Sequence, residues 1–283
     1  MSNMYSLLIL SILAASLNNT LLHKLPDSTN IYRFNLHIAI LWICILFVMN
    51  HGKVTINKGI ILWGVIYGVA QVLFLIFKTL AMLNGPVSIT TLIGNCSMLL
   101  SISASIIIWN EEVHIWHIMG LLLLLFSIFL CTNANGVMVY KKHWILYSIL
   151  YFLLCGCIGI IFKLFATSEY KQYRLDMMIV SAFIISIFLC IALANGRSNS
   201  AFHFSSSYCL LVFLCGIMSC SYTLLNLYLS GNLPGTVFFP GFNGGVIVLT
   251  AILSRLLLHE KLTIKQVTGI ICGTISVSIL SIL

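Results

Sequence analysis

Long apolar runs, separated by short polar segments, repeat along the whole chain. A helix of roughly 20 apolar residues crosses the hydrocarbon of a bilayer. The polar segments carry Pro, Gly, Asn and Ser, which are typical of helix ends and turns. The pattern predicts ten membrane-spanning helices, at residues 4–22, 34–50, 58–79, 87–109, 115–133, 144–165, 176–195, 207–229, 236–258 and 264–283.

Two stretches of the chain share one pattern of polar residues. The matched positions hold Asn, Pro, Glu, Gly and Ser, which chance similarity between two Leu/Ile-rich helices does not align. They pair Asn84 with Asn232, Pro86 with Pro234, Asn95 with Asn243, Glu111 with Glu260, Gly120 with Gly269 and Ser127 with Ser276. We therefore predict a duplication, with a first repeat at 1–137 and a second at 138–283, in one integral-membrane unit without a soluble domain.

An odd number of spans in each repeat turns the second repeat upside down. The predicted fold is thus an all-α polytopic membrane protein, with ten transmembrane helices in two inverted five-helix repeats. Inverted repeats are typical of secondary transporters, whose substrate site lies near the midplane between the halves.

Composition supports this prediction. The chain is 60% hydrophobic and 7% charged, so lipid rather than water must cover most of its surface. The net charge of +8 does not indicate nucleic acid, because the basic residues are spread singly over short loops. No basic residue precedes the apolar run Tyr5–Leu22, which favours a retained helix over a signal peptide. The Lys and Arg count of the loops leaves the orientation of the termini open.

Chemistry that needs a metal or a nucleophile is not visible in the sequence. Glu111, His114 and His117 recur every three residues, but they straddle a helix junction without a known zinc pattern. The cysteines lie mostly inside apolar runs, where a free thiol acts as a small hydrophobe. Membrane enzymes need a metal cluster, a carboxylate pair or a nucleophile with its base. We expect no metal, no cofactor and no enzymatic activity.

One motif of the second repeat resembles that of a known family. Pro240, Glu260, Leu262-Thr263 and Gly269 resemble the repeat of EamA-type permeases, the ten-helix members of the drug/metabolite transporter superfamily. The first repeat keeps the glutamate and the glycine of the motif. It departs from the motif where Thr91 or Leu92 replaces the proline and Val113-His114 replaces Leu-Thr.

The resemblance implies an architecture and a location. It implies a central cavity lined mainly by predicted spans 1, 3, 4, 6, 8 and 9, with spans 5 and 10 at the periphery. It implies that Glu111 and Glu260 cap or pair at the surface of helix junctions rather than bind substrate. It also implies a bacterial cytoplasmic membrane.

Polar residues inside the predicted spans are candidates for the cavity, because such groups are costly in lipid. They fall on single helical faces, and faces matched by the duplication should meet at the pseudo-twofold axis. The alternative is hydrogen bonding between helices. The candidates are Asn18, Asn19, Tyr67, Gln71, Phe74, Lys78, Thr91, Asn95, Ser219, Tyr222, Asn226, Phe239 and Asn243, with Pro240 and Gly241 as a break or gate, or alternatively a simple kink.

The lysines within the spans have two interpretations. Lys78 shares a helical face with Tyr67 and Gln71, so it either binds substrate or extends its ammonium group to the interface. For Lys24 and Lys163, which match under the duplication, extension to the interface or a lipid headgroup is favoured. No Asp or Glu lies in the middle of a predicted span, which argues against proton exchange through a buried carboxylate.

We therefore expect a secondary transporter of small polar metabolites, of the amino-acid-like, zwitterionic or anionic kind, that works by alternating access. A flippase for a lipid-linked headgroup and multidrug or cation efflux are the alternatives. The expected partners are a small-molecule substrate and the lipid bilayer, without nucleic acid. Gly269 and Gly273 permit close helix packing, either inside the chain or in a homodimer.

Overall fold

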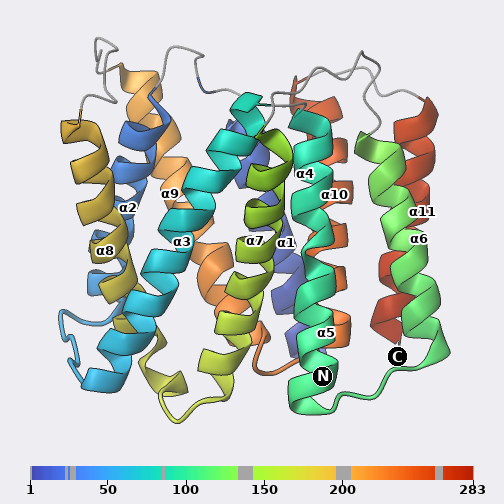
Figure 1. Ribbon diagram of the computed structural model, residues 1–283, viewed down its shortest axis with the longest axis horizontal. Helices are drawn as coiled ribbons and strands as arrows, with labels where there is room; N and C mark the ends of the chain where they lie inside the picture. Colours follow the sequence, from blue (N-terminus) through green and yellow to red (C-terminus); the bar gives the residue numbers. More distant parts are fainter. Residues whose placement is uncertain are drawn as a thin grey trace.

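The chain folds into a bundle of helices that run alternately in opposite directions (Figure 1). The computed structural model describes residues 2–22, 25, 30–84, 87–132, 143–195, 205–258 and 264–282. The predicted features at Lys24, Pro86 and 259–263, which include Glu260, lie outside these ranges. The helices are α1 Ser2–Leu22, α2 Ile31–Met49, α3 Lys58–Asn84, α4 Val87–Cys96, α5 Met98–Trp109, α6 Ile115–Thr132, α7 Trp144–Thr167, the 3-10 turn η1 Lys171–Tyr173, α8 Arg174–Ala194, α9 Ser206–Leu229, α10 Gly235–Leu258 and α11 Ile264–Ile282.

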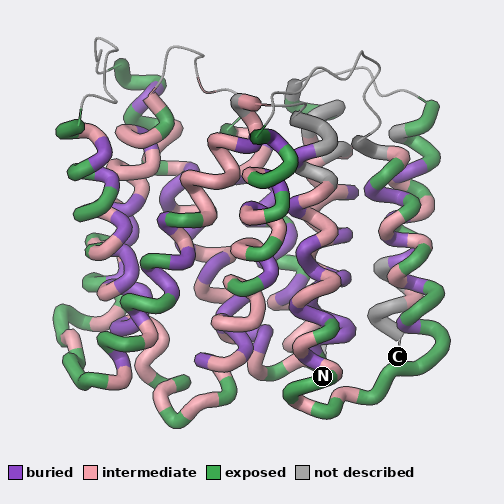
Figure 2. The backbone as a smooth tube through the Cα atoms, viewed as in Figure 1, coloured by how far each residue is buried: buried purple, intermediate pink, exposed green. Residues whose placement is uncertain are grey.

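The helices have the length and surface of an integral membrane protein. Within the described ranges, six helices are long and apolar enough to cross a bilayer, namely α1, α2, α3, α7, α8 and α9. Shorter apolar helices, of 10–17 residues, occupy parts of the remaining four predicted spans. Many large apolar side chains point outward, such as Ile107 (76% exposed) and Val48 (74% exposed). Figure 2 shows buried positions along the helices and exposed ones in the loops at the end that holds both termini.

We call the end of the bundle where α1 begins and α11 ends the terminus end, and the other the cavity end (Figure 1). The described connections at 50–57, 110–114, 168–173 and 230–234 all lie at the terminus end. A cavity lies toward the cavity end, and a buried ion pair lies at the terminus end.

The predicted span 87–109 is not one helix. It divides at Ser97 into α4 and α5. The Ser97 amide bonds to the Gly94 carbonyl, three residues back, which tightens the turn. Gly94 lies against α7 at this point, since a Cβ there would stand 2.2 Å from the Tyr151 hydroxyl oxygen.

Several helix pairings can be compared with the register of the predicted duplication. Under that register α1 corresponds to α7 and α3 to α9, and the packing of α1 against α9 is matched by that of α3 against α7. The pairs α2–α8 and α6–α11 each join corresponding helices. The pair α6–α11 lies at one edge of the bundle (Figure 1), where the resemblance places predicted spans 5 and 10.

Two reciprocal hydrogen bonds join α6 to α11. The Ser127 hydroxyl donates to the Gly269 carbonyl, and the Ser276 hydroxyl donates to the Gly120 carbonyl, both at 2.6 Å. The duplication matches Ser127 with Ser276 and Gly120 with Gly269, so each bond is the other's counterpart.

We expect Ser127→Ala and Ser276→Ala to destabilise the protein by similar amounts. Each removes one buried hydrogen bond between helices, which contributes about 1 kcal/mol. Thermal unfolding in detergent measures both variants. Thr268→Ala is the control, because the exposed Thr268 hydroxyl bonds only to the Ile264 carbonyl of its own helix. A loss in only one of the two serine variants would contradict the reciprocal arrangement.

Glycines allow helices of the chain to pack closely, for example at Gly64 and Gly273. A Cβ on Gly64 would lie 2.6 Å from Val180 of α8, so α3 and α8 approach closely there. A Cβ on Gly273 would lie 2.5 Å from Val248 of α10 and 2.6 Å from the Ser127 hydroxyl. The face of Gly269 and Gly273 is thus used inside the bundle, and a homodimer stays a prediction.

Candidate functional site

A cavity of about 200 Å³ lies between α1, α2, α3, α8 and α9. Its wall includes Leu22, Asn35 and Lys78, which lie within two turns of the ends of α1, α2 and α3. Those helix ends are at the cavity end of the bundle (Figure 1). The cavity therefore extends from the middle of the bundle toward this end.

Seven of the predicted cavity residues lie on this wall. They are Asn18, Asn19, Gln71, Phe74, Lys78, Ser219 and Tyr222.

Among the described residues of the wall, Lys78 is the only one with a charged side chain. The helix α3 continues to Asn84, so Lys78 lies about one and a half turns inside it. Its Nζ atom lies 5.7 Å from the centre of the Phe74 ring, a cation–π contact on the cavity wall.

The wall also contains residues that the sequence prediction missed. Asn35, Ala39 and Trp42 form one face of α2, at the spacing of a helical stripe. The Trp42 indole N–H donates to the Ser219 hydroxyl at 2.9 Å, which joins α2 to α9. Asn35 and Trp42 are seven residues apart and so lie on one face of α2, and this spacing could have identified them from the sequence.

The expected lining of the cavity needs a correction. Among the described residues, the wall takes side chains from α2 and α8 and none from α4, α7 or α10. The expected lining by predicted spans 4, 6 and 9 is therefore not seen on the described wall of this cavity.

Other predicted cavity residues are engaged inside the bundle. Tyr67 is 2% exposed and packs in the core, with its ring centre 5.0 Å from that of Phe162. The Ser11 hydroxyl donates to the Asn226 side-chain oxygen at 2.7 Å and joins α1 to α9. Asn226 thus follows the alternative interpretation, in which polar groups connect helices, and Tyr67 packs as an aromatic core residue.

The predicted break in span 9 is absent. The helix α10 runs from Gly235 to Leu258 and includes both Pro240 and Gly241. The proline lies early in the helix, where its missing N–H removes a single backbone bond. Phe239 packs in the core, and the Asn243 side chain donates to the Phe239 carbonyl at 2.8 Å.

The two remaining candidates belong to α4. Asn95 is half-buried in α4 and does not lie on the cavity wall. The side chain of Thr91 lies outside the described part of the structure.

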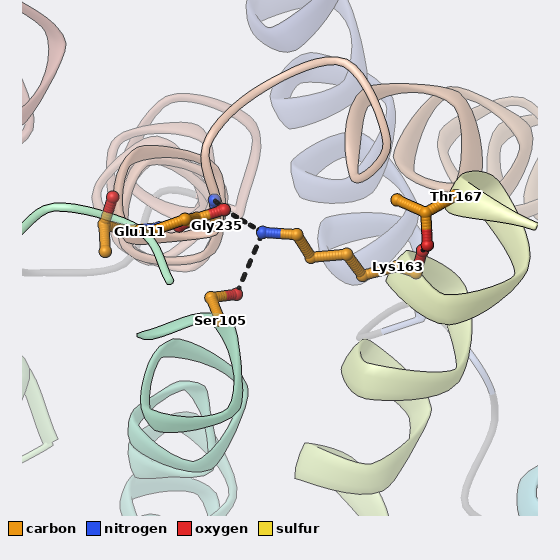
Figure 3. Close-up of polar contacts among 6 residues, drawn as sticks. Ser105, Glu111, Lys163, Thr167 and Gly235 are labelled. Atoms are coloured by element: carbon orange, nitrogen blue, oxygen red, sulfur yellow. Dashed lines mark hydrogen bonds and ion pairs between the residues drawn. The ribbon is translucent and has the colours of Figure 1, made fainter. Parts of the chain in front are cut away.

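A buried ion pair lies at the terminus end of the bundle. Figure 3 shows Lys163 of α7 reaching toward Glu111 and Ser105. Its ammonium group pairs with the Glu111 carboxylate and donates to the Ser105 hydroxyl at 3.1 Å. It also lies 4.8 Å from the centre of the Trp109 ring. The side chains of Lys163 and Glu111 are 5% and 15% exposed, so the expected extension of Lys163 to the interface is wrong.

The Glu111 carboxylate also caps α10. It accepts from the amides of Gly235 at 2.9 Å and Thr236 at 3.0 Å, the first two residues of that helix. A negative charge is favourable at a helix N-terminus. The chain reaches this position because Asn110 ends α5 in the left-handed conformation, with φ 51°. Glu111 thus does cap and pair at a helix junction, as expected, with its side chain mostly covered by α7 and α10.

Hydrogen bonding keeps Glu111 ionised. Burial alone would raise the pKa of this carboxyl, but the hydrogen bonds from Lys163, Gly235 and Thr236 lower the pKa below its ordinary value. A lowered pKa in the folded state means that ionised Glu111 stabilises the fold above the ordinary carboxyl pKa. This contribution is lost as the pH falls through the lowered value.

A second carboxylate makes similar contacts at the same end of the bundle. Asp176, in the first turn of α8, is 4% exposed. One of its oxygens accepts from the Asn50 side chain and from the Thr55 amide, both at 2.9 Å. These contacts tie α8 to the connection between α2 and α3. Sequence reasoning placed Asp176 at a helix end but gave it no role.

The suggested metal ligands do not converge on one point. The His114 amide donates to the Nδ1 atom of His117 at 3.1 Å, and the two rings stack. The Glu111 carboxylate is turned to Lys163 and α10 instead.

Comparisons with known proteins show the fold alone. No protein-family model matches this chain, and no curated protein matches its sequence significantly. A solved structure titled only "Crystal structure of protein" superposes with a TM-score of 0.80 at 11% identity. The match covers 100% of this chain and 97% of that chain. The resemblance to EamA-type permeases stays a prediction.

Proposed function

We propose that the protein is a secondary transporter of small solutes that carry a carboxylate, either amino-acid-like zwitterions or anions. The observation that carries this proposal is a cavity inside a membrane bundle whose wall holds one lysine among amide and aromatic side chains. Ligand sites combine an apolar lining with a few polar groups that fix orientation.

The charge of the wall favours this class of solute. Its described residues include Lys78 and the amides of Asn18, Asn19 and Gln71, and none of them is acidic. The amide N–H groups and the ammonium group donate hydrogen bonds to carboxylate oxygens. A cationic solute would meet repulsion from Lys78 without a counter-charge, which disfavours cation efflux.

We further propose ten spans in two inverted repeats of the EamA type, which rock against each other to give alternating access. The paired packing of α1 with α9 and of α3 with α7 supports this symmetry. So do the reciprocal bonds between α6 and α11.

A ligand screen by thermal stability tests the proposal. The purified protein is heated with amino acids, nucleosides, sugar phosphates, polyamines or quaternary amines. A ligand that binds only the folded state stabilises it by about 2.7 kcal/mol at a hundredfold excess over Kd. We expect stabilisation by at least one carboxylate-bearing solute.

Lys78→Met is expected to abolish this stabilisation, because the carboxylate loses its counter-ion. Lys58→Met is the matched control: Lys58 is exposed on the first turn of the same helix, at the other end of the bundle. Equal stabilisation of Lys78→Met and the wild type would contradict the proposed site. Stabilisation by cations alone, or by lipids alone, would favour efflux or flippase activity instead.

A further inference from the structure

We propose that Glu111, Lys163 and Asp176 form a releasable lock, which closes the terminus end of the bundle while the cavity faces the other end. The inference rests on the proposed alternating-access function and identifies the contacts that must break when the cavity changes sides. The closing contacts are of two sets. In the first, Glu111 binds Lys163, Gly235 and Thr236. In the second, Asp176 binds Asn50 and Thr55.

Every closing contact crosses between the two predicted repeats. Glu111 belongs to the first repeat, and its partners Lys163, Gly235 and Thr236 belong to the second. Asp176 belongs to the second repeat, and it binds Asn50 and Thr55 of the first. A movement that separates the two repeats at this end must therefore break both sets of contacts.

An aromatic contact lies between the cavity and the closing contacts. Tyr67 precedes the wall residue Gln71 by one turn of α3, toward the terminus end. Its ring packs on Phe162, which directly precedes Lys163 in α7. Tyr67 and Phe162 come from different repeats. The path from the cavity to the terminus end is thus closed first by aromatic rings and then by ions.

Ionic contacts suit a closure that must release. Lys163 is buried and Glu111 is partly buried in this conformation, so the attraction of the pair is partly offset by the lost hydration of both ions. Opening this end admits water, which restores that hydration. The ion pair therefore fixes the geometry of the closed state, while the free energies of the closed and open states differ only slightly. Apolar packing of the same area would have no such compensation.

Hydrogen–deuterium exchange of the whole protein in lipid nanodiscs tests the lock. Glu111→Gln keeps one acceptor oxygen and the side-chain shape but removes the charge. Asp176→Asn does the same at the second contact. The control is Glu112→Gln, because Glu112 is the exposed neighbour of Glu111.

The closing contacts hold two segments, 230–238 through Glu111 and 50–57 through Asp176. We expect amide exchange about tenfold faster than in the wild type at residues 230–238 in Glu111→Gln and at residues 50–57 in Asp176→Asn. We also expect slower exchange at residues 18–22 and 31–38, because opening one end shifts the population toward closure of the cavity end. The Glu112→Gln control is expected to match the wild type at both ends.

Faster exchange at the terminus end without slower exchange at the cavity end would contradict the proposal. That result is expected if the closing contacts only stabilise the fold locally. Unchanged exchange in folded, monodisperse variants would also overturn the lock. The ligand screen is independent of this measurement. Opposite changes at the two ends without any stabilising carboxylate would leave the lock standing and defeat only the proposed substrate.

Discussion

Lys163→Met is expected to lower the free energy of unfolding by about 3 kcal/mol. The substitution nearly preserves the volume of the side chain, but it leaves the partly buried Glu111 carboxylate without its counter-ion. The amides of Gly235 and Thr236 still bind that carboxylate, so the protein should fold. Thermal unfolding can be followed by maleimide labelling of Cys215 and Cys220, whose thiols are free and buried.

The double variant Lys163→Met/Glu111→Gln separates charge from packing. Removing both charges takes away the unpaired ion, so the double variant should be more stable than Lys163→Met alone. A double variant that is no more stable than the single one would show that the loss comes from packing around the lysine stem.

Gly235→Ala is expected to disrupt the junction of α5, α7 and α10. A Cβ at this position would lie 2.0 Å from the Ser105 hydroxyl oxygen and 2.8 Å from the Lys163 Nζ atom. Both atoms belong to the buried network, so α10 must move away from α5 at a cost of about 1–3 kcal/mol. The same labelling assay measures this loss.

Two further variants make the Gly235→Ala result specific. Gly241→Ala lies in the same helix, but its Cβ would meet only Leu8, at 3.6 Å. It should therefore be tolerated, since alanine favours helix over glycine. Ser105→Gly removes the obstructing hydroxyl and should partly restore Gly235→Ala. Equal losses in Gly235→Ala and Gly241→Ala would point to backbone conformation instead of the steric contact.

The sequence predicted the features that depend on local pattern. Apolar periodicity located the helices, although it could not detect the tightened turn at Ser97, because the single Gly94 before it does not interrupt the apolar pattern. The duplication stays a prediction, and the bonds of Ser127 and Ser276 join positions that it pairs. Helices can be located from local pattern because spacing along a helix decides which residues share a face.

Contacts between distant parts of the chain were harder to predict. Lys163 ends an apolar run, and such a position favours extension to the interface. Nothing near it in sequence reveals that Glu111 lies beside it in the bundle. In the same way, Asn35 and Trp42 reach the cavity because α2 packs beside α9, which helical spacing alone does not determine.

The pairing of α6 with α11 can form only late in synthesis of the chain, because α11 is translated long after α6. The two helices are separated by about 130 residues, which a ribosome needs roughly 7 to 26 seconds to translate. During that interval α6 is already made, while the carbonyl that accepts from Ser127 does not yet exist. A nascent chain stalled before Ile264 would therefore present an unpaired helix edge to the insertion and quality-control machinery. The helix α11 completes this edge, so the contact between α6 and α11 can form only after residues 264–282 have been translated.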